Sequence, residues 1–170
     1  MRQSRADRIL VKASRQSCKR SNNGGLAVYT AIQEPKSLTL MLSPTFRQSQ
    51  EFFQRDALGA YRAAGRPVDP QAENRLSLEL ENGSRIVSLP GKGETVRGYS
   101  GVRLLIIDEA AYVPDELYLA VLPMLAVSGG RLVASSTPFG DRGWWYEAWQ
   151  SDGPWERYHV PWTECPRIKP

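Results

Sequence analysis

The sequence has few of the side chains that bind transition metals. It contains two cysteines, Cys18 and Cys165, one histidine, His159, and no Cys-x-x-Cys pair. A zinc site needs more nitrogen and sulfur ligands than these, so we exclude one. We interpret Cys165 and His159 as incidental residues of the C-terminal tail.

Long hydrophobic runs are also absent. The longest apolar runs, such as residues 104–107, are far too short to cross a bilayer. Residues 1–8 contain no apolar stretch of signal-peptide length. We therefore expect a cytoplasmic protein that makes no use of a membrane.

The composition is that of an ordinary globular protein. The chain has 170 residues, of which 41% are hydrophobic and 24% are charged, enough for one domain with a buried core. Its net charge of +4 and isoelectric point near 9.2 permit a polyanionic partner. Basic charge alone does not demonstrate such a partner, because many basic proteins bind no nucleic acid.

Strand and helix patterns alternate along the chain, which is typical of an α/β fold with a mainly parallel sheet and flanking helices. We predict strands at 8–13, 37–43, 102–108, 131–135 and 155–160. We predict helices that end near residue 33 and that span 46–64, 115–125 and 141–150. Thr45 is a suitable N-cap, and Gly65 a suitable end, for the second helix. The first helix contains Asn22, Asn23, Gly24 and Gly25, which weaken a helix interior.

One β-hairpin is predicted between these elements. Leu76, Leu78 and Leu80 alternate with polar residues, and Ile86 belongs to the returning strand. Asn82 and Gly83 between them are the preferred pair for a type I′ turn, in which both central residues have positive φ.

Three polar segments follow three of the predicted core strands, at the edge where open α/β sheets bind ligands. The first, 13–20, lies where a phosphate-binding loop of pattern G-x-x-x-x-G-K-[ST] belongs, but only Lys19 agrees with that pattern. Ala13 and Cys18 replace the glycines, and Arg20 replaces the Ser or Thr. On this pattern alone, a basic surface loop is the alternative.

The second segment is a strand of four apolar residues that ends in Asp108 and Glu109. This pattern fits a Walker B element, in which Asp108 holds Mg²⁺ through water and Glu109 orients and deprotonates the attacking water. Two adjacent carboxylates need a cation to offset their repulsion. The alternative is a strand that ends in a helix-capping Asp.

The third segment is Ser135, Ser136 and Thr137, followed by Pro138. Hydroxyl groups at the end of a core strand are suited to sensing the γ-phosphate of a nucleotide. The alternative is an ordinary turn before a proline.

Five segments occur in a characteristic order: S-R-Q-S-x-K at 14–19, S-P-T-F-R-Q-S-Q at 43–50, V-R-G-Y-S at 96–100, I-I-D-E-A-A at 106–111 and S-S-T-P-x-G at 135–140. Their order and sequence resemble the N-terminal ATPase domain of phage large terminase subunits over about residues 8–160. The resemblance implies a RecA-like P-loop fold with a β-hairpin insertion. It also implies the cofactors ATP and Mg²⁺.

The resemblance also implies roles for individual residues. Lys19 contacts the β and γ phosphates, Arg15 acts in cis as an arginine finger, and Glu109 is the catalytic carboxylate. Asp108 serves Mg²⁺, while the hydroxyls of 135–137 couple hydrolysis to motion. The whole nucleotide-binding loop comprises Ser14, Arg15, Gln16, Ser17, Cys18, Lys19 and Arg20.

The partners implied by the resemblance are double-stranded DNA, a small terminase subunit and the capsid portal, with the chain acting as a homo-oligomeric ring in the host cytoplasm. We expect residues 1–160 to form the ATPase core. We expect 161–170 to begin a linker to a nuclease domain outside this chain, so that the chain is truncated relative to the family.

Departures from the family leave two functional hypotheses open. Cys18 and Arg20 alter the phosphate loop, because a Cβ crowds the phosphate and a guanidinium cannot ligate a metal. The first hypothesis is an ATP-hydrolysing motor domain for DNA packaging. The second is an inactive fragment or prophage remnant that keeps only DNA-binding or assembly surfaces, with candidate phosphate contacts at Arg85, Lys92, Arg97 and Arg103.

Overall fold

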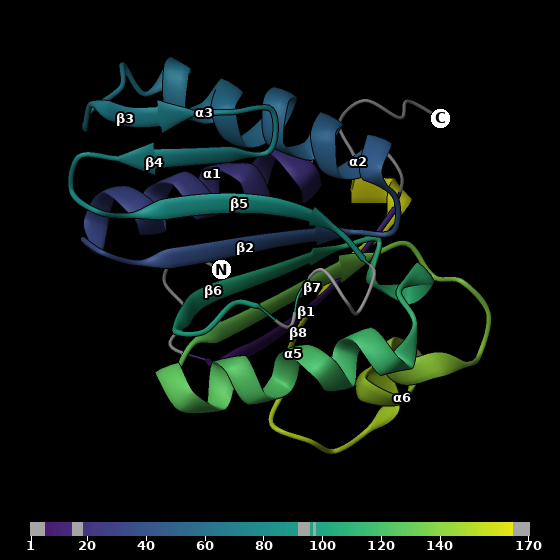
Figure 1. Ribbon diagram of the computed structural model, residues 1–170. Coiled ribbons are helices and arrows are strands. Elements are labelled where there is room, and N and C mark those ends of the chain that lie inside the picture. The colour runs from purple at the N-terminus through teal and green to yellow at the C-terminus, as the bar shows by residue number, and fades with distance from the viewer. Residues whose placement is uncertain (1–5, 15–18, 92–95, 97, 165–170) are drawn as a thin grey trace.

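The computed structural model describes residues 6–14, 19–91, 96 and 98–164 (Figure 1). The strands of these ranges form one eight-stranded sheet in the order β3-β4-β5-β2-β6-β7-β1-β8. The strands are β1 Arg8–Ala13, β2 Leu38–Ser43, β3 Pro70–Glu73, β4 Ser77–Leu80, β5 Arg85–Pro90, β6 Val102–Asp108, β7 Arg131–Ser136 and β8 Glu156–Val160.

The sheet is mainly parallel, as the sequence predicts. The strands from β5 to β8 in the sheet order pair in parallel, and β4 pairs antiparallel with both β3 and β5. The predicted strands and the observed strands agree to within a residue at their ends. The short strand β3 was not predicted, because its sequence PQAE carries no alternating apolar pattern.

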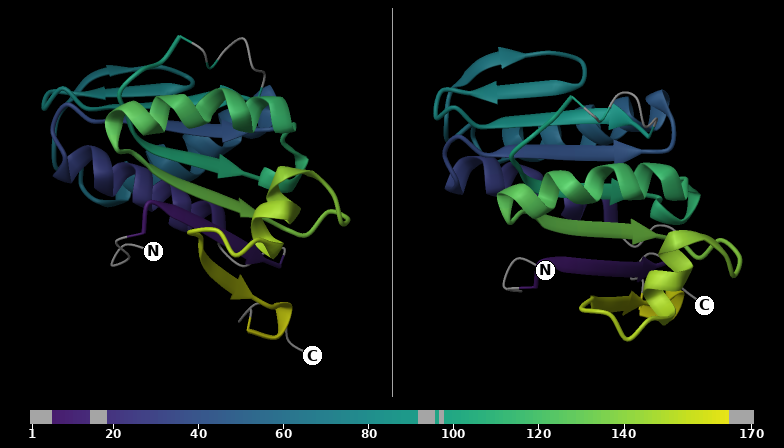
Figure 2. Two further views of the ribbon diagram at one scale, coloured as in Figure 1. Left: turned by 90° about the horizontal axis from the view of Figure 1, so that it is seen from below. Right: turned by 60° about the horizontal axis from the view of Figure 1, so that its bottom comes forward.

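Helices cover both faces of the sheet. The views of Figure 2 show α5 and α6 on one side of the strands and α1 on the other. The helical elements are α1 Lys19–Gln33, α2 Phe46–Glu51, the π-helix η1 Phe52–Ala57, α3 Leu58–Ala63, the 3₁₀ turn η2 Ala110–Tyr112, α5 Asp115–Ser128, α6 Gly143–Gln150 and the 3₁₀ turn η3 Trp162–Glu164. None of the helices in the described ranges is long and apolar enough to span a bilayer.

Each face of the sheet has its own hydrophobic core. In β6, Leu104 and Ile106 pack with α1 and η1, whereas Leu105 and Ile107 pack with α5 and α6. Successive side chains of a strand point to opposite faces, so an unbroken apolar run fills both cores. The polar end of β6 is thereby fixed between two packed layers.

The predicted helix 46–64 is present, but it is not an α-helix throughout. Thr45 caps it as expected, with its Oγ1 accepting a hydrogen bond of 3.3 Å from the backbone N–H of Gln48. The middle of this helix, however, is a π-helix from Phe52 to Ala57. Periodicity alone does not distinguish that wider turn from an α-helix, and π-turns are frequent at functional sites.

Helix α1 runs unbroken through the Asn and Gly residues that weaken it. Asn23 and Gly24 are buried. A Cβ on Gly24 would lie 2.6 Å from the carbonyl carbon of Asp56 and 2.8 Å from the backbone nitrogen of Ala57. The glycine is therefore what lets α1 approach η1, and close packing offsets its low helix propensity.

The predicted hairpin is present, but the predicted turn type is wrong. Strands β4 and β5 pair through Leu78 and Ile86, and the backbone N–H of Leu80 donates to the carbonyl of Ser84 at 2.9 Å. Of the two turn residues, Gly83 has positive φ, at 81°, and Asn82 does not. The Asn82 side chain instead donates to the carbonyl of Ala31 at 2.8 Å and accepts from the N–H of Ser84 at 3.0 Å. A tertiary contact with α1 thus replaces the local turn preference.

Candidate functional site

The three polar segments singled out in the sequence meet at one edge of the sheet. Strand β7 lies between β1 and β6, and Asp108 is in register with Ser135 across the β6–β7 pair. Because the three strands are parallel, their carboxyl ends lie together, as the arrowheads in Figure 1 show. Helix α1 begins at Lys19, beside this edge, after the loop that follows β1.

Lys19, the one residue that agrees with the phosphate-loop pattern, faces Glu109. Its Nζ lies 2.8 Å from Oε1 of Glu109, and the Lys19 side chain is 9% exposed. This separation is that of a close ion pair, which commits the ammonium group to Glu109. A phosphate at the start of α1 would therefore compete with Glu109 for Lys19.

Arg20, the next residue, forms an ion pair with Asp108. Its Nε donates to Oδ2 of Asp108 at 2.8 Å, and one Nη donates to the carbonyl of Gln48 at 3.2 Å. The guanidinium also lies over the Phe52 ring, 5.7 Å from its centroid, and 3.9 Å from a carboxylate oxygen of Glu51. Contacts from β6, α2 and η1 therefore fix this cation in the site.

Asp108 is fully buried at the end of β6. Burial raises the pKa of its carboxyl to about 6, and the adjacent Glu109 raises it too, while Arg20 and Lys19 lower it. Desolvation outweighs the favourable pairing with Arg20, as expected where a charge leaves water. Perturbed carboxyl groups of this kind are concentrated at functional sites.

Ser135 connects Asp108 to helix α1. Its Oγ accepts a hydrogen bond of 2.8 Å from Nδ2 of Asn23 and lies 3.5 Å from Oδ1 of Asp108, toward which it donates. All three side chains are buried. A polar line of contacts therefore crosses the edge of the sheet from α1 through β7 to β6.

The other two hydroxyls of this segment contact the turn after β6. The Oγ of Ser136 accepts from the backbone N–H of Ala111 at 3.2 Å, and the Oγ1 of Thr137 donates to Oε2 of Glu109 at 3.4 Å. Glu109 itself has φ 50° and ψ 46°, a left-handed conformation that costs a side-chain-bearing residue about 1–2 kcal/mol. Strain of this kind persists where the surroundings hold the residue in place, which these contacts do.

The structure thus brings together six of the residues selected from the sequence: Lys19, Arg20, Asp108, Glu109, Ser135 and Thr137. Ser14 follows β1, with its N–H donating to the carbonyl of Val160 at 3.1 Å and its Oγ buried without a partner among the described residues. Arg15, Gln16, Ser17 and Cys18 lie outside the described residues. Their predicted roles remain predictions.

Three further residues of the site were not selected from the sequence: Asn23, Gln48 and Glu51. Asn23 was interpreted as a weakness of the helix, yet it is one turn beyond Lys19 and lies on the same face. That spacing from Lys19 was the available signal. Gln48 acts through its backbone carbonyl, which no sequence pattern specifies.

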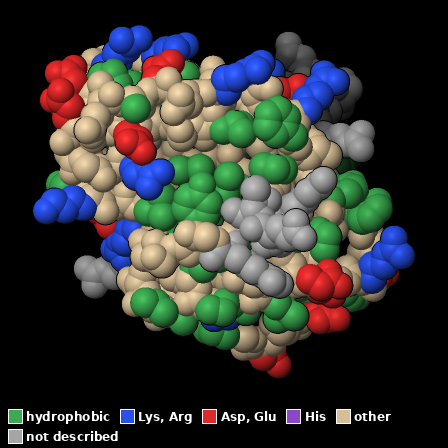
Figure 3. Space-filling model, in the orientation of Figure 1, with side chains coloured by type: hydrophobic (Ala, Val, Ile, Leu, Met, Phe, Trp, Pro, Cys, Tyr) green, Lys and Arg blue, Asp and Glu red, His purple; other side chains and the backbone are tan. Residues whose placement is uncertain are grey.

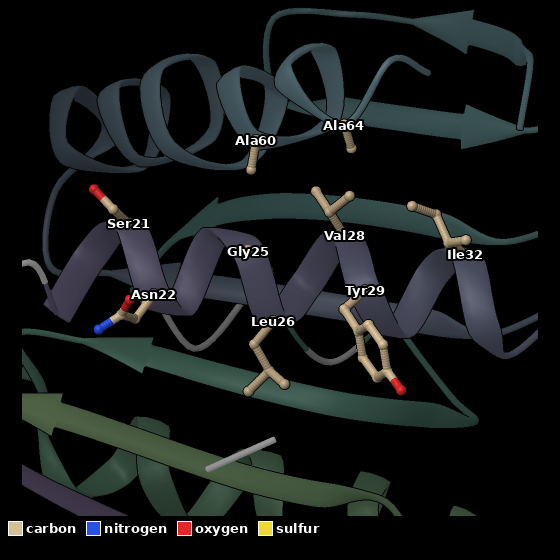
Figure 4. Close-up of a pocket in the computed structure, with 9 residues that line it drawn as sticks. All are labelled: Ser21, Asn22, Gly25, Leu26, Val28, Tyr29, Ile32, Ala60 and Ala64. Carbon is tan, nitrogen blue, oxygen red and sulfur yellow. The ribbon is translucent and has the colours of Figure 1, made fainter. Parts of the chain in front are cut away.

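The site opens into a small pocket of about 370 Å³, lined by Pro44, Thr45, Gln48, Glu109, Tyr112 and Thr137. A larger hollow of about 600 Å³ lies elsewhere, between α1 and α3. There Val28 and Ile32 point toward Ala60 and Ala64 (Figure 4), and no ionisable side chain except Tyr29 lines it. The charged and hydroxyl-bearing side chains selected from the sequence, Glu109 and Thr137, therefore line the smaller pocket and not the larger one.

The contacts of Asp108 do not fit a divalent metal. One carboxylate oxygen accepts from Arg20 and the other faces Ser135. A magnesium ion at Asp108 would have to displace a guanidinium of the same charge sign. The prediction of Mg²⁺ at Asp108 remains a prediction that the geometry does not favour.

Of the four basic residues considered as contacts for DNA, the two that the structure describes are each paired with an acidic residue. Arg85 lies 2.8 Å from a carboxylate oxygen of Glu79, and Arg103 is paired with Glu34. Lys92 and Arg97 lie outside the described residues. On the face shown in Figure 3, Lys and Arg side chains are scattered around the margin and interspersed with acidic ones.

Comparison with known proteins gives consistent results, although no protein-family model matches the sequence. The chain is 30% identical over 164 residues to the large terminase subunit of Thermus virus P23-45, an alignment that covers 85% of this chain and 33% of that protein. The chain therefore spans about a third of the length of this curated relative.

Among solved structures, the large terminase ATPase domain of Thermus phage P74-26 matches with a TM-score of 0.80 and 23% identity, over 93% of this chain and 77% of that one. The large terminase of another thermophilic bacteriophage, in complex with ADP, matches with a TM-score of 0.76 and 15% identity, over 96% of this chain and 42% of that one. A second structure of that large terminase, in complex with ATP-γ-S, has a TM-score of 0.75 and 13% identity over the same shares of the two chains.

Proposed function

We propose that this chain, which has the fold of phage large terminase ATPase domains, is a homologue of those proteins, binds ATP and acts in the motor that packages DNA. The observation that carries this proposal is the pairing of both carboxylates at the end of β6 with both cations at the start of α1. Lys19 faces Glu109, and Arg20 faces Asp108, each at 2.8 Å.

These pairs explain how the site would receive a nucleotide. The phosphates would lie at the N-terminus of α1, where unpaired backbone N–H groups and Lys19 favour an anion. Lys19 is paired with Glu109 at 2.8 Å, so a phosphate would compete with that carboxylate for it. Loss of this partner would free Glu109 to act as a general base toward a water molecule. Thr137, 3.4 Å from Glu109, would then orient the carboxylate.

The same contacts supply a route by which the state of the nucleotide reaches the rest of the domain. Ser135 is hydrogen-bonded to α1 through Asn23 and faces Asp108, and Ser136 holds the turn after β6. A change at the phosphates would move α1 against β7 through these hydroxyls. We propose this as the coupling role of residues 135–137.

Double-stranded DNA, a small terminase subunit, the capsid portal and further copies of the chain are the partners proposed from the family. The proposed place of action is the cytoplasm of the infected host. The division between an ATPase core at 1–160 and a linker at 161–170 is likewise proposed from the family.

One observation favours the second candidate function, an inactive relative that keeps only binding or assembly surfaces. Arg20 stands where the family pattern has a hydroxyl, and it occupies the carboxylate that would serve a metal. DNA binding that does not depend on ATP, with no measurable turnover of ATP, is what this alternative predicts.

Hydrolysis of ATP, with and without double-stranded DNA, separates the two candidates. We expect slow release of phosphate by the unaltered chain and faster release by a Cys18→Gly, Arg20→Ser double variant. Glu109→Gln in the double-variant background serves as the control and should return release to background. Failure of both proteins to bind ATP, with both folded, would contradict the proposed function.

A further inference from the structure

We propose that Arg20 replaces the divalent cation of this site, so that the chain binds the phosphates of a nucleoside triphosphate without a metal ion. This inference rests on the proposed function for its ligand. It adds that the charge beside Asp108 is supplied by the protein itself.

Arg20 lies at the start of α1, where a phosphate would bind. It follows Lys19 in the first turn of α1, and its side chain is 30% exposed. The guanidinium is therefore held within the site but remains open to a ligand. A phosphate at the N-terminus of the helix would meet Lys19 and Arg20 together.

Arg20 uses only some of its N–H groups within the protein. Of the five N–H groups of a guanidinium, Nε donates to Asp108 and one on Nη2 donates to Gln48. Arg20 makes no other hydrogen bond within the described part of the chain, and its Nη1 also lies 3.9 Å from a carboxylate oxygen of Glu51. The remaining N–H groups can take phosphate oxygens, and a planar fork suits two oxygens at once.

Both carboxylate oxygens of Asp108 already have partners within the protein. Its carboxylate is inaccessible to solvent, with Arg20 on one oxygen and Ser135 on the other. A divalent cation would need one of these oxygens and would be repelled by the guanidinium. The ion pair therefore competes with a metal for the same atoms.

The two acidic side chains of the site are matched by two basic ones. Asp108 and Glu109 are adjacent in sequence, and two adjacent carboxylates need cations nearby. Lys19 and Arg20 provide one each, both at 2.8 Å. The pair of acids is thus compensated within the protein.

Binding of a fluorescent ATP analogue, in EDTA and in magnesium chloride, tests the proposal on the unaltered chain. We expect dissociation constants within about twofold of each other in the two conditions. Binding that requires magnesium would overturn the inference and leave the proposed function standing. Absence of binding in both conditions would overturn the inference and the proposed function together.

Variants of Arg20 extend the test. Arg20→Ser removes the cation and restores a hydroxyl. In EDTA, its affinity for the ATP analogue should fall about tenfold or more, which is the value of one or two charge-assisted hydrogen bonds. In magnesium chloride, the affinity should recover. Arg20→Lys keeps the charge and should remain independent of magnesium, which supplies a folded comparison if the Ser variant is unstable. Arg62→Ser, which breaks the surface ion pair of Arg62 with Glu73, is the matched control and should change neither constant. Equal affinity of the Arg20→Ser variant and the unaltered chain in EDTA would refute the role of Arg20.

Discussion

Gly24 and Asp56 lie in backbone contact, with only a hydrogen atom of the glycine between α1 and the π-helix η1. A Cβ at Gly24 would lie 2.6 Å from the carbonyl carbon of Asp56, and backbone atoms cannot move aside as a flexible side chain does. Ser21, one turn earlier, donates to a carboxylate oxygen of Asp56 at 3.1 Å, so the same two elements are joined by a hydrogen bond.

We expect Gly24→Ala to lower the free energy of unfolding by about 2–3 kcal/mol, because overpacking outweighs the gain in helix propensity. Gly25→Ala is the matched control. A Cβ at Gly25 meets nothing within 4 Å, so this change should raise stability by up to about 1 kcal/mol. Urea unfolding of both variants measures the difference, and equal midpoints would show that the contact is unimportant.

Asn23 and Ser135 are expected to be energetically coupled. Asn23→Ala leaves the buried Ser135 hydroxyl without its donor and should cost about 1–3 kcal/mol in urea unfolding. The exposed neighbour provides the control, since Asn22→Ala replaces a weak helix former by a strong one and should be neutral or slightly stabilising. A double-mutant cycle with Ser135→Ala should give a coupling energy of about 1 kcal/mol, and additive effects would argue against the polar line across the sheet.

The stability of the fold should depend on pH through Asp108. Its pKa is raised from 3.8 to about 6, so between these values the folded protein keeps a proton that the unfolded chain has released. The protonated carboxyl therefore stabilises the fold below pH 4, and this contribution is lost as the pH rises to about 6. At 1.36 kcal/mol per pKa unit, the free energy of unfolding falls by about 3 kcal/mol over this range. Asp108→Asn removes the titrating group.

We therefore expect the stability of the unaltered chain, relative to that of the Asp108→Asn variant, to fall between pH 4 and pH 7. Urea unfolding at several pH values gives this difference directly. The exposed Asp152 supplies the control, because Asp152→Asn should leave the pH profile of the unaltered chain in place. A constant difference between the chain and the Asp108→Asn variant would contradict the raised pKa.

Loss of the cap at Thr45 should weaken the helical rod that carries Gln48. Thr45→Ala removes the acceptor of the Gln48 backbone N–H and should cost about 1 kcal/mol. Thr45→Ser keeps an oxygen at the same place and should cost much less. The comparison is made by urea unfolding, and similar losses in the two variants would assign the effect to the Thr methyl group instead.

Much of the fold was predictable because its core strands carry strong local patterns. The strands 8–13 and 102–108 are buried on both faces. Their ends could be predicted because each apolar run is followed by polar residues. The predicted polar segments at the ends of these strands do lie together, since parallel strands share one edge; their role as a nucleotide site remains a prediction. Asp108 and Glu109 were found for this reason.

What the sequence did not predict depends on contacts between distant elements. The pairing of Arg20 with Asp108 joins residues 88 positions apart, and nothing local to either one specifies it. The turn at Asn82 was mistaken for type I′ because its side chain binds α1, 51 positions earlier. Gly24 was interpreted as a helix weakness because its partner, η1, is recognised only once the two elements are packed.

The position of β1 in the sheet sets the order in which the domain can be completed. Arg8 pairs with Leu132, and Ile9 pairs with Glu156, so both neighbours of the first strand are more than a hundred residues away in sequence. During synthesis this strand must remain unpaired until β7 and then β8 have emerged, and contacts of such long range slow folding. A chain interrupted before residue 131 would retain Lys19 and Glu109 but would lack both strands that pair with β1. The strand that precedes α1 would then not be held in the sheet.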